Sequence, residues 1–308
     1  MVLRAMPRTI AYLGPAGTYG EQAANHFARR LGGGINLRPC DTIGDVYAAS
    51  KACDYAVLPL ENTLQGVVLE TVDALLSPLA DPAFPAMEYL YPPTPDALAS
   101  QGGVASPTAP EQPHIVADTT LSISHQLVGL RGSRLEDIRY VRSHEQALGQ
   151  CSAWLDNYLP HAERVPWPST AGALTSVLAQ GDKSGAAICS RAAVEREGSR
   201  VNVLAEGVQG VKNNFTRFLL LSREAPAPPP ADAHKIAFYA LRDIGSIGAI
   251  SHFGPALSIH QRPAPPGAVA GVPFPRFALA EVRVNALAMD TSGAILMGSF
   301  NPEDVNLS

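Results

Sequence analysis

The chain has 308 residues, of which 46% are hydrophobic and 17% are charged, and its formal net charge is −5. This length allows two domains, and the composition excludes a chain that is disordered throughout. The net negative charge, without any long run of basic residues, argues against a nucleic-acid partner.

We expect neither a secretory signal nor a membrane span. The N-terminal MVLRAMPRTI holds no apolar stretch of signal-peptide length, and no apolar segment of about 18 residues follows. The cysteines at positions 40, 53, 151 and 189 lack the close spacing of a zinc site, so free buried thiols are expected. These features predict a cytoplasmic protein that has no membrane partner and no metal.

Short apolar runs alternate with helical patterns over residues 8–90. A strand is predicted over residues 10–13 and a helix directly after it. A second helix is predicted over residues 43–52, and a buried strand over 55–58 that ends at Pro59. This order of elements predicts an α/β domain with a mainly parallel sheet.

The same α/β pattern resumes at His114 and continues to about Arg223. Residues 92–113, between the two parts, are rich in Pro, Gly, Ser and Ala and are predicted to form a surface insertion or a disordered loop. Residues 224–234 read as a proline-rich linker. A separate C-terminal unit over residues 235–303 begins with a strand-like run.

Three predicted helix starts are polar and follow predicted strands. Thr18 and Glu21 have the spacing of a capping box, as do Ser143 and Gln146. A third helix opens at Ser169. Free backbone N–H groups at a helix start favour an anion, and α/β folds bind ligands beyond the strand ends. We therefore predict an anion site that the three helix starts share.

Two further polar strings adjoin apolar strands, at residues 61–63 and 213–217. Turn chemistry explains polar residues at a strand end equally well. In the functional interpretation, Arg217 forks onto a carboxylate while Thr216 and the neighbouring amides donate hydrogen bonds. The histidines other than His144 are expected to fill the surface or the core.

Taken in chain order, these strings resemble the prephenate dehydratase family over about residues 9–223. The motifs that carry the resemblance are GPAGTY at 14–19, PLENT at 59–63, SHEQALGQC at 143–151, STA at 169–171 and NFTRF at 214–218. The resemblance implies an α/β catalytic domain over residues 8–223 with two lobes like a periplasmic binding protein. It also implies a small α+β ACT-like regulatory domain over residues 235–303.

The resemblance implies conversion of prephenate to phenylpyruvate by loss of CO2 and the ring hydroxyl, with no cofactor. It gives proton donation to Thr216, and we expect Arg217, Glu61 and Asn62 to complete the catalytic set. Contacts with the substrate are expected from Gly17, Thr18, Thr63, Ser143, His144, Gln146, Ser169, Thr170, Asn214 and Phe218.

Two other functions stay open. An arogenate dehydratase acts on an amine in place of the ketone, and the sequence does not separate the two substrates. The other alternative is a non-catalytic homologue, either a small-anion-binding module of the same fold or an inactive regulatory protein. The absence of an export signal and the presence of Thr216 count against the binding module. The regulatory protein stays open because Gly20 and Gly210 stand where the family has a serine and an acidic residue.

The C-terminal unit departs further from the family. Gly248 and Ala249 only loosely resemble the effector loop of an ACT domain, and Arg262 lies in HQRP where the family has ESRP. The proline-rich stretches at 263–266 and 273–275 are expected to disrupt a paired strand. We therefore predict weak or altered control by L-phenylalanine, in a homodimer or homotetramer.

Overall fold

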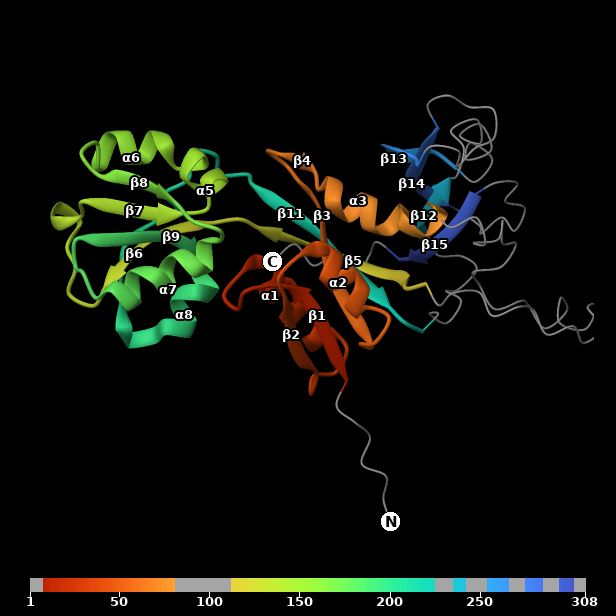
Figure 1. Ribbon diagram of the computed structural model, residues 1–308, viewed down its shortest axis with the longest axis horizontal. Helices are drawn as coiled ribbons and strands as arrows, with labels where there is room; N and C mark the ends of the chain where they lie inside the picture. The colour runs from red at the N-terminus through yellow and green to blue at the C-terminus, as the bar shows by residue number, and fades with distance from the viewer. Residues whose placement is uncertain are drawn as a thin grey trace, which may run out of the picture.

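The computed structural model describes residues 8–80, 112–224, 235–241, 254–265, 275–284 and 294–301. They form three β-sheets arranged in a row (Figure 1). The first sheet lies in the middle, with the second sheet on one side of it and the C-terminal sheet on the other. Helices cover the first two sheets, which form the two α/β lobes that the sequence predicts.

The first lobe is built on a mixed sheet. Its strands, in spatial order, are β2 (Asn36–Cys40), β1 (Thr9–Leu13), β3 (Tyr55–Asn62), β11 (Phe215–Ser222) and β5 (His114–Ser122), with β4 (Gly66–Val67) beside β3. β1 pairs in parallel with β2 and β3, whereas β11 pairs antiparallel with β3 and β5. Strands β1, β2 and β3 are therefore parallel, as predicted, but the sheet as a whole is mixed because β11 enters it in the opposite direction.

Both faces of the first sheet are apolar and covered. Helix α1 (Tyr19–Arg30) packs on one face, and α2 (Ile43–Ala49) and α3 (Leu69–Leu76) pack on the other. A short 3-10 helix, η1 (Ser77–Ala80), follows α3. The C-terminal sheet packs on the same face as α2 and α3, so this face is buried under helices and strands together.

The second lobe has a mixed sheet of its own. Its strands, in spatial order, are β10 (Val201–Glu206), β6 (His125–Leu130), β9 (Gly185–Ser190), β7 (Tyr140–Ser143) and β8 (Glu163–Pro166). One face carries α5 (Glu145–Gln150) and α6 (Ser152–Tyr158), and the other carries α7 (Thr170–Gln180) and α8 (Arg191–Glu197). Two 3-10 helices, η2 (Leu135–Asp137) and η3 (Gly198–Arg200), complete the lobe.

The second lobe is inserted in the sequence between β5 and β11 of the first lobe. The chain therefore crosses between the lobes twice, at residues 123–124 and at residues 207–214. The two crossings lie together, since the Ile123 backbone N–H donates to the Asn214 carbonyl over 2.8 Å. Residues at the crossings can thus contact both lobes.

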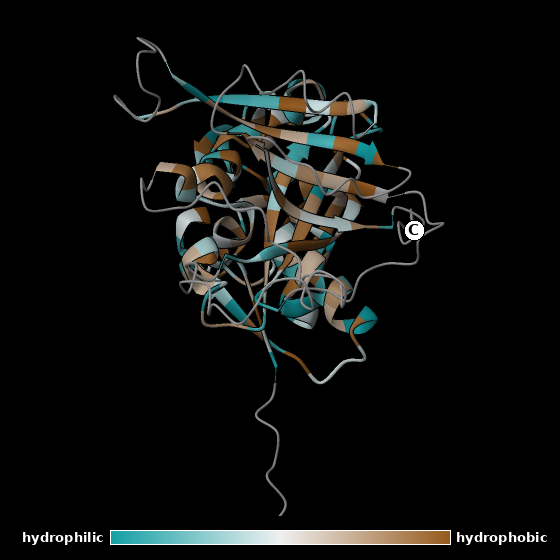
Figure 2. Cartoon of the chain, turned by 90° about the vertical axis from the view of Figure 1, so that its right-hand side faces the viewer, coloured by the Kyte–Doolittle hydropathy of each residue, from teal (hydrophilic) through white to brown (hydrophobic). Residues whose placement is uncertain are grey.

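The C-terminal sheet is antiparallel throughout its described strands. In spatial order these are β13 (Ala256–Pro263), β14 (Arg276–Val284), β12 (Lys235–Leu241) and β15 (Ala294–Phe300). Figure 2 views the chain from the side of this sheet and shows hydrophilic and hydrophobic residues interleaved along strands there. Such interleaving fits strands whose two faces differ in their surroundings.

Part of the expectation for the C-terminal unit is wrong. β13 pairs with β14 as far as Pro263, which lies opposite Arg276, so this proline does not disrupt the strand. A proline is tolerated there because β13 lies at the edge of the sheet. Gly248 and Ala249 lie outside the described residues, and their assignment to an effector site stays a prediction.

The helix starts follow the sequence signals in two of three cases. Thr18 and Ser169 accept hydrogen bonds from the backbone N–H groups of Glu21 and Gly172, as predicted for caps. The prediction for Ser143 is wrong. Its hydroxyl is buried and donates to the Ile188 carbonyl, and the neighbouring His144 caps α5 through its ring nitrogen.

Four smaller expectations concern the end of β3, the cysteines, a membrane span and a metal site. β3 does not end at Pro59 but continues to Asn62. The four cysteines are buried and free, as predicted. Among the described residues, no helix has the length and apolar character needed to cross a membrane, and no group of His, Cys, Asp and Glu could hold a metal ion.

A first prediction concerns what holds the C-terminal sheet in place. Arg262 of β13 pairs with Asp73 of α3, with a 2.7 Å contact between Nη2 and Oδ2, but both side chains are partly exposed. Asp73→Asn should therefore cost at most about 1 kcal/mol of unfolding free energy. Leu279→Ala should cost about 2–5 kcal/mol, because Leu279 is fully buried between the two sheets. Urea denaturation of both variants measures these costs, and a larger cost for Asp73→Asn would contradict this view.

Candidate functional site

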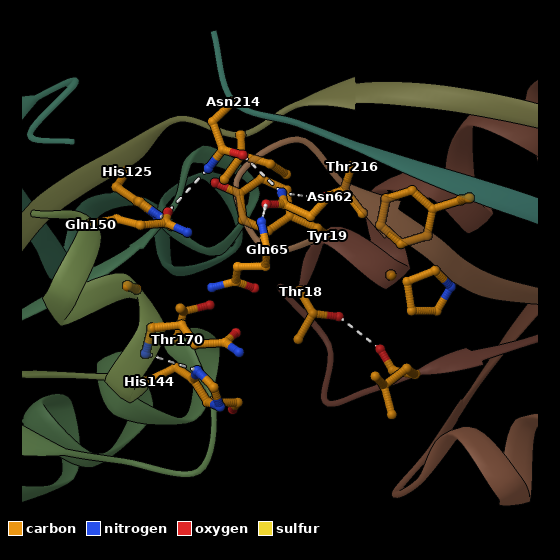
Figure 3. Close-up of a pocket in the computed structure, with 18 of the residues that line it drawn as sticks. Thr18, Tyr19, Asn62, Gln65, His125, His144, Gln150, Thr170, Asn214 and Thr216 are labelled. Atoms are coloured by element: carbon orange, nitrogen blue, oxygen red, sulfur yellow. Dashed lines mark hydrogen bonds between the residues drawn. The ribbon is translucent and has the colours of Figure 1, made fainter. Parts of the chain in front are cut away.

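A cavity of about 420 Å³ lies between the two lobes. The first lobe lines it with Leu13, Gly14, Thr18, Tyr19, Gly20, Asp41, Pro59, Asn62, Gln65, Thr216 and Phe218. The second lobe contributes His144, Gln146, Ala147, Gln150, Pro168, Ser169 and Thr170. Ile123, His125 and Asn214, at the two crossings, complete the wall. A ligand in this cavity would therefore contact both lobes (Figure 3).

The three predicted helix starts meet at this cavity. Thr18 and Tyr19 begin α1, His144 precedes α5, and Ser169 and Thr170 begin α7. Each helix start presents backbone N–H groups and the positive end of the helix dipole, which favour a negative charge. Among the described lining residues there is no Lys or Arg. An anion bound here would therefore be held by helix starts and neutral donors.

Asn62 is fixed in its orientation by its own loop. Its Oδ1 accepts the backbone N–H groups of Leu64 and Gln65 over 2.9 and 3.1 Å. The amide nitrogen must therefore point the other way, and it lies 3.0 Å from Thr216 Oγ1 and 2.8 Å from Asn214 Oδ1. Because an amide nitrogen only donates, it cannot accept the Thr216 hydroxyl hydrogen.

The Thr216 hydroxyl is thus prepared to donate. The Thr216 oxygen accepts a hydrogen bond from Asn62, and none of the described residues accepts the Thr216 hydroxyl hydrogen. Thr216 lines the cavity beside Phe218, because residues two apart on β11 share a face of the sheet. The arrangement leaves one hydroxyl donor for a ligand in the cavity.

A second set of hydrogen bonds continues from Asn214 to the far side of the cavity (Figure 3). Asn62 donates to Asn214 Oδ1, so Asn214 Nδ2 points away and donates to Gln150 Oε1 over 3.1 Å. The same oxygen lies 3.0 Å from His125 Nε2, which must therefore carry a hydrogen. Burial lowers the pKa of His125, which favours the neutral ring, and the hydrogen bond to Gln150 opposes this effect.

His125 is one of several lining residues that the sequence analysis did not single out. This histidine is buried, as expected for one that fills the core, and it lines the cavity as well. The Tyr19 ring stands edge-on to it, with ring centroids 6.2 Å apart, and the Tyr19 hydroxyl donates to the Ser124 carbonyl over 2.7 Å. Tyr19 and Gln150 lay within motifs quoted above, which was the available signal for them.

Not every expected site residue lies on the cavity wall. Gly17 donates its N–H to Glu21 Oε2 over 2.6 Å and accepts from the Ser190 hydroxyl, which joins the two lobes. Thr63 accepts the Phe215 N–H over 2.9 Å at the end of β3. Together with Ser143, these residues support the walls and do not line the cavity.

Arg217 and Glu61 also lie off the cavity. The Arg217 guanidinium contacts Glu281 of the C-terminal sheet through two hydrogen bonds of 2.8 and 2.9 Å. It also donates to Asp118 over 2.7 Å and to Glu61 over 3.4 Å. Arg217 thus makes the expected bidentate contact with a carboxylate, but this carboxylate is the side chain of Glu281 and not a ligand.

The comparisons with known proteins cover most of the chain. The family model described as Prephenate dehydratase matches residues 10–226. The "Bifunctional chorismate mutase/prephenate dehydratase" of Neisseria gonorrhoeae is 32% identical over 246 residues, which are 79% of this chain and 58% of that protein. "Arogenate dehydratase 1" of Petunia hybrida is 30% identical over 221 residues, which are 71% of this chain and 43% of that protein.

This chain thus spans about half the length of these curated relatives. Among solved structures, the prephenate dehydratase of Arthrobacter aurescens in complex with L-Phe is similar, with a TM-score of 0.71 and 22% identity. That similarity covers 95% of this chain and 90% of the other, and at this identity it supports the fold alone. Because the family match runs through both lobes and includes the residues at the cavity, this chain belongs to the prephenate dehydratase family.

Proposed function

We propose that this chain is a cofactor-free prephenate dehydratase, a carbon–oxygen lyase that makes phenylpyruvate. The observation that carries the proposal is the hydrogen bond from Asn62 Nδ2 to Thr216 Oγ1. It leaves the Thr216 hydroxyl hydrogen free at the wall of a cavity that three helix starts surround. Prephenate suits such a cavity, because its two carboxylates can lie at helix starts and its departing hydroxyl can accept a hydrogen bond from Thr216.

The two carboxylates of prephenate need positive potential at two places. The start of α1 lies in the first lobe, and the starts of α5 and α7 lie in the second. Each can receive one carboxylate through backbone N–H groups, and at the start of α7 the hydroxyls of Ser169 and Thr170 can add hydrogen bonds. Binding between the lobes therefore orients the substrate ring across the cavity.

The reaction breaks two bonds. The bond from the ring to its carboxylate carbon breaks, CO2 leaves, and the electron pair moves into the ring. The bond from the ring to the hydroxyl oxygen breaks at the opposite position, and hydroxide takes up a proton and leaves as water. Aromaticity of the product drives both events. A threonine hydroxyl is a poor acid, so Thr216 acts by donating a hydrogen bond that strengthens as charge develops on the departing oxygen.

Replacing Thr216 tests this role directly. Thr216→Ala should lower kcat by about 10²–10⁴-fold, the range for one positioned donor at a reacting group. Thr216→Ser keeps the hydroxyl and should retain most of the activity. Steady-state rates of phenylpyruvate formation measure both, with circular dichroism as the control for folding. A kcat near that of the wild type in Thr216→Ala would remove this residue from the mechanism.

The role of Asn62 gives a separate prediction. In Asn62→Asp, the carboxylate still accepts the N–H groups of Leu64 and Gln65, but its other oxygen accepts the Thr216 hydroxyl hydrogen. The hydrogen then points away from the substrate, so kcat should fall by about 10²-fold or more. The double variant with Thr216→Ala should be no slower than the slower single variant, because the two residues act as a unit. Losses that multiply would show that they act independently.

A second candidate function is arogenate dehydratase, and one observation favours it. Asp41 is the acidic side chain among the described lining residues. A carboxylate in the wall would attract the ammonium group of arogenate, which prephenate lacks, whereas its repulsion of the two carboxylates is common to both substrates. The related petunia protein is named an arogenate dehydratase. The preferred substrate therefore depends on whether Asp41 reaches the side chain of the substrate.

An assay of the purified chain with both substrates decides between these functions. We expect phenylpyruvate from prephenate to be the faster product. Asp41→Asn should lower kcat/KM for arogenate relative to prephenate by about two- to fivefold if the exposed carboxylate contacts the ammonium group. A chain that binds prephenate but turns over neither substrate would be a non-catalytic homologue, and the proposed function would then be wrong.

A further inference from the structure

The Arg217 guanidinium lies in a buried group of carboxylates on the side of the first sheet that faces away from the cavity. Its partners are Asp118 of β5, Glu281 of β14 and Glu61 of β3, here called the Arg217 cluster. The side chains of Arg217, Asp118 and Glu281 are 15%, 6% and 5% exposed. The cluster therefore joins four strands, β3, β5 and β11 of the first sheet and β14 of the C-terminal sheet.

Within the cluster, Glu281 holds the guanidinium most closely. Its two oxygens accept from Nη1 and Nη2, which is the bidentate geometry that fixes the plane of an arginine. Ser258 of β13 donates to Glu281 Oε2 over 3.2 Å and helps to orient the carboxylate. The Phe238 ring of β12 lies below the guanidinium, at 5.8 Å from its centroid. Three strands of the C-terminal sheet thus support the contact.

The charges in the cluster are uneven, since one cation faces several carboxylates. Burial raises the pKa of Asp118, and the charge of Arg217 offsets only part of that effect. Burial lowers the pKa of Arg217, but the hydrogen bonds and charges of Glu281 and Asp118 outweigh it and raise the pKa overall. The guanidinium is therefore charged, and removal of a partner would leave it poorly compensated in a buried place.

Strand geometry connects this cluster with the cavity. Side chains along a strand alternate between its faces, so Arg217 points to the C-terminal sheet while Thr216 and Phe218 point to the cavity. The cores agree, since Leu219 packs with the C-terminal sheet and Leu220 packs with α1. A contact that holds or moves the Arg217 side chain therefore also holds or moves the β11 backbone at Thr216, the preceding residue.

The backbone ladder on one side of that segment is interrupted. Between Arg217 and Phe218 the pairing of β11 with β3 shifts register, and the residue opposite Phe218 is Pro59. Proline has no N–H to donate to the ladder, and a bulge leaves a residue unpaired. Pairing with β5 continues without a shift from Phe215 to Leu220. Because the backbone pairing with β3 is interrupted here, side-chain contacts contribute more to the position of β11 at Thr216 than they would in a continuous ladder.

We infer that Glu281 is a positioning residue, which fixes β11 through Arg217 and so places the Thr216 hydroxyl in the cavity. The C-terminal sheet then has a direct mechanical connection to the cavity wall. The kinetic part of this inference rests on the proposed function, whereas the structural part does not.

The test compares three variants of the full chain. Glu281→Gln keeps the shape but removes the charge, and Glu281→Asp keeps the charge with a shorter reach. Asp73→Asn is the matched control, because it breaks the other carboxylate–arginine contact between the first lobe and the C-terminal sheet, away from β11. Hydrogen–deuterium exchange over Phe215–Ser222 and steady-state kinetics are measured for each.

Glu281→Gln should speed exchange over β11 and lower kcat by about 10- to 100-fold, since a shift of about 1 Å at a reacting group has effects of this size. KM should change less than about twofold, because the helix starts that bind the substrate are untouched. Glu281→Asp should restore part of kcat. Asp73→Asn should change neither readout.

A second control separates positioning from general stability. Leu279→Ala lies two residues from Glu281 on β14 and weakens the apolar contact between the same two sheets, while it leaves every charged group of the Arg217 cluster in place. It should leave kcat near that of the wild type at a temperature where the protein is folded. An equal fall of kcat in Leu279→Ala would overturn the inference, as would unchanged exchange and unchanged kcat in Glu281→Gln.

The outcomes for the two proposals can be told apart. If the wild type turns over neither prephenate nor arogenate, the proposed function is wrong. Exchange over β11 in Glu281→Gln, measured against Asp73→Asn, still decides whether Glu281 holds this strand.

Discussion

The alternation of side chains along β11 separates two kinds of chemistry in this molecule. Thr216 and Phe218 face the cavity, and Arg217 between them faces the C-terminal sheet. A strand cannot turn one of these residues without moving the others, because successive side chains leave opposite faces of the sheet. The cavity therefore keeps neutral donors on this strand, while the charge of Arg217 is neutralised behind it by Asp118 and Glu281.

A chain of oriented amides connects the two lobes across the cavity. The backbone N–H groups of the loop after β3 fix Asn62, and each following partner is fixed by the one before it, through Asn214 and Gln150 to His125. The amide oxygen and nitrogen of Asn62 and of Asn214 are thereby distinguished, although the two hydrogens of Asn62 Nδ2 share three acceptors, Asn214 Oδ1, the Phe215 carbonyl and Thr216 Oγ1. A substitution at Asn62 or at His125 would therefore change which groups donate and which accept at the other end of this chain, on the opposite side of the cavity. Connected hydrogen-bond networks generally behave in this way.

Local sequence signals predicted the local parts of the site. Thr18 was predicted as a helix cap because a cap and its partner lie only three residues apart, and a helix was predicted to open at Ser169. Strand alternation, applied to residues 215–218, would also have placed Arg217 opposite to Thr216. The partner of Arg217 could not be found in this way, since Glu281 lies 64 residues away in another sheet. His125 likewise reaches the cavity only because two crossings of the chain meet there.

The absence of Lys and Arg from the described cavity wall has a consequence for turnover. A fixed cation would attract both the substrate and the product. Each helix start, in contrast, stabilises only the carboxylate that it contacts, because its effect falls off within the first turn. Under the proposed function, one carboxylate leaves as CO2, so one of the helix starts loses its anion at the moment of reaction. The product then holds the two lobes together less strongly than the substrate did, and its departure is favoured without any further change in the protein.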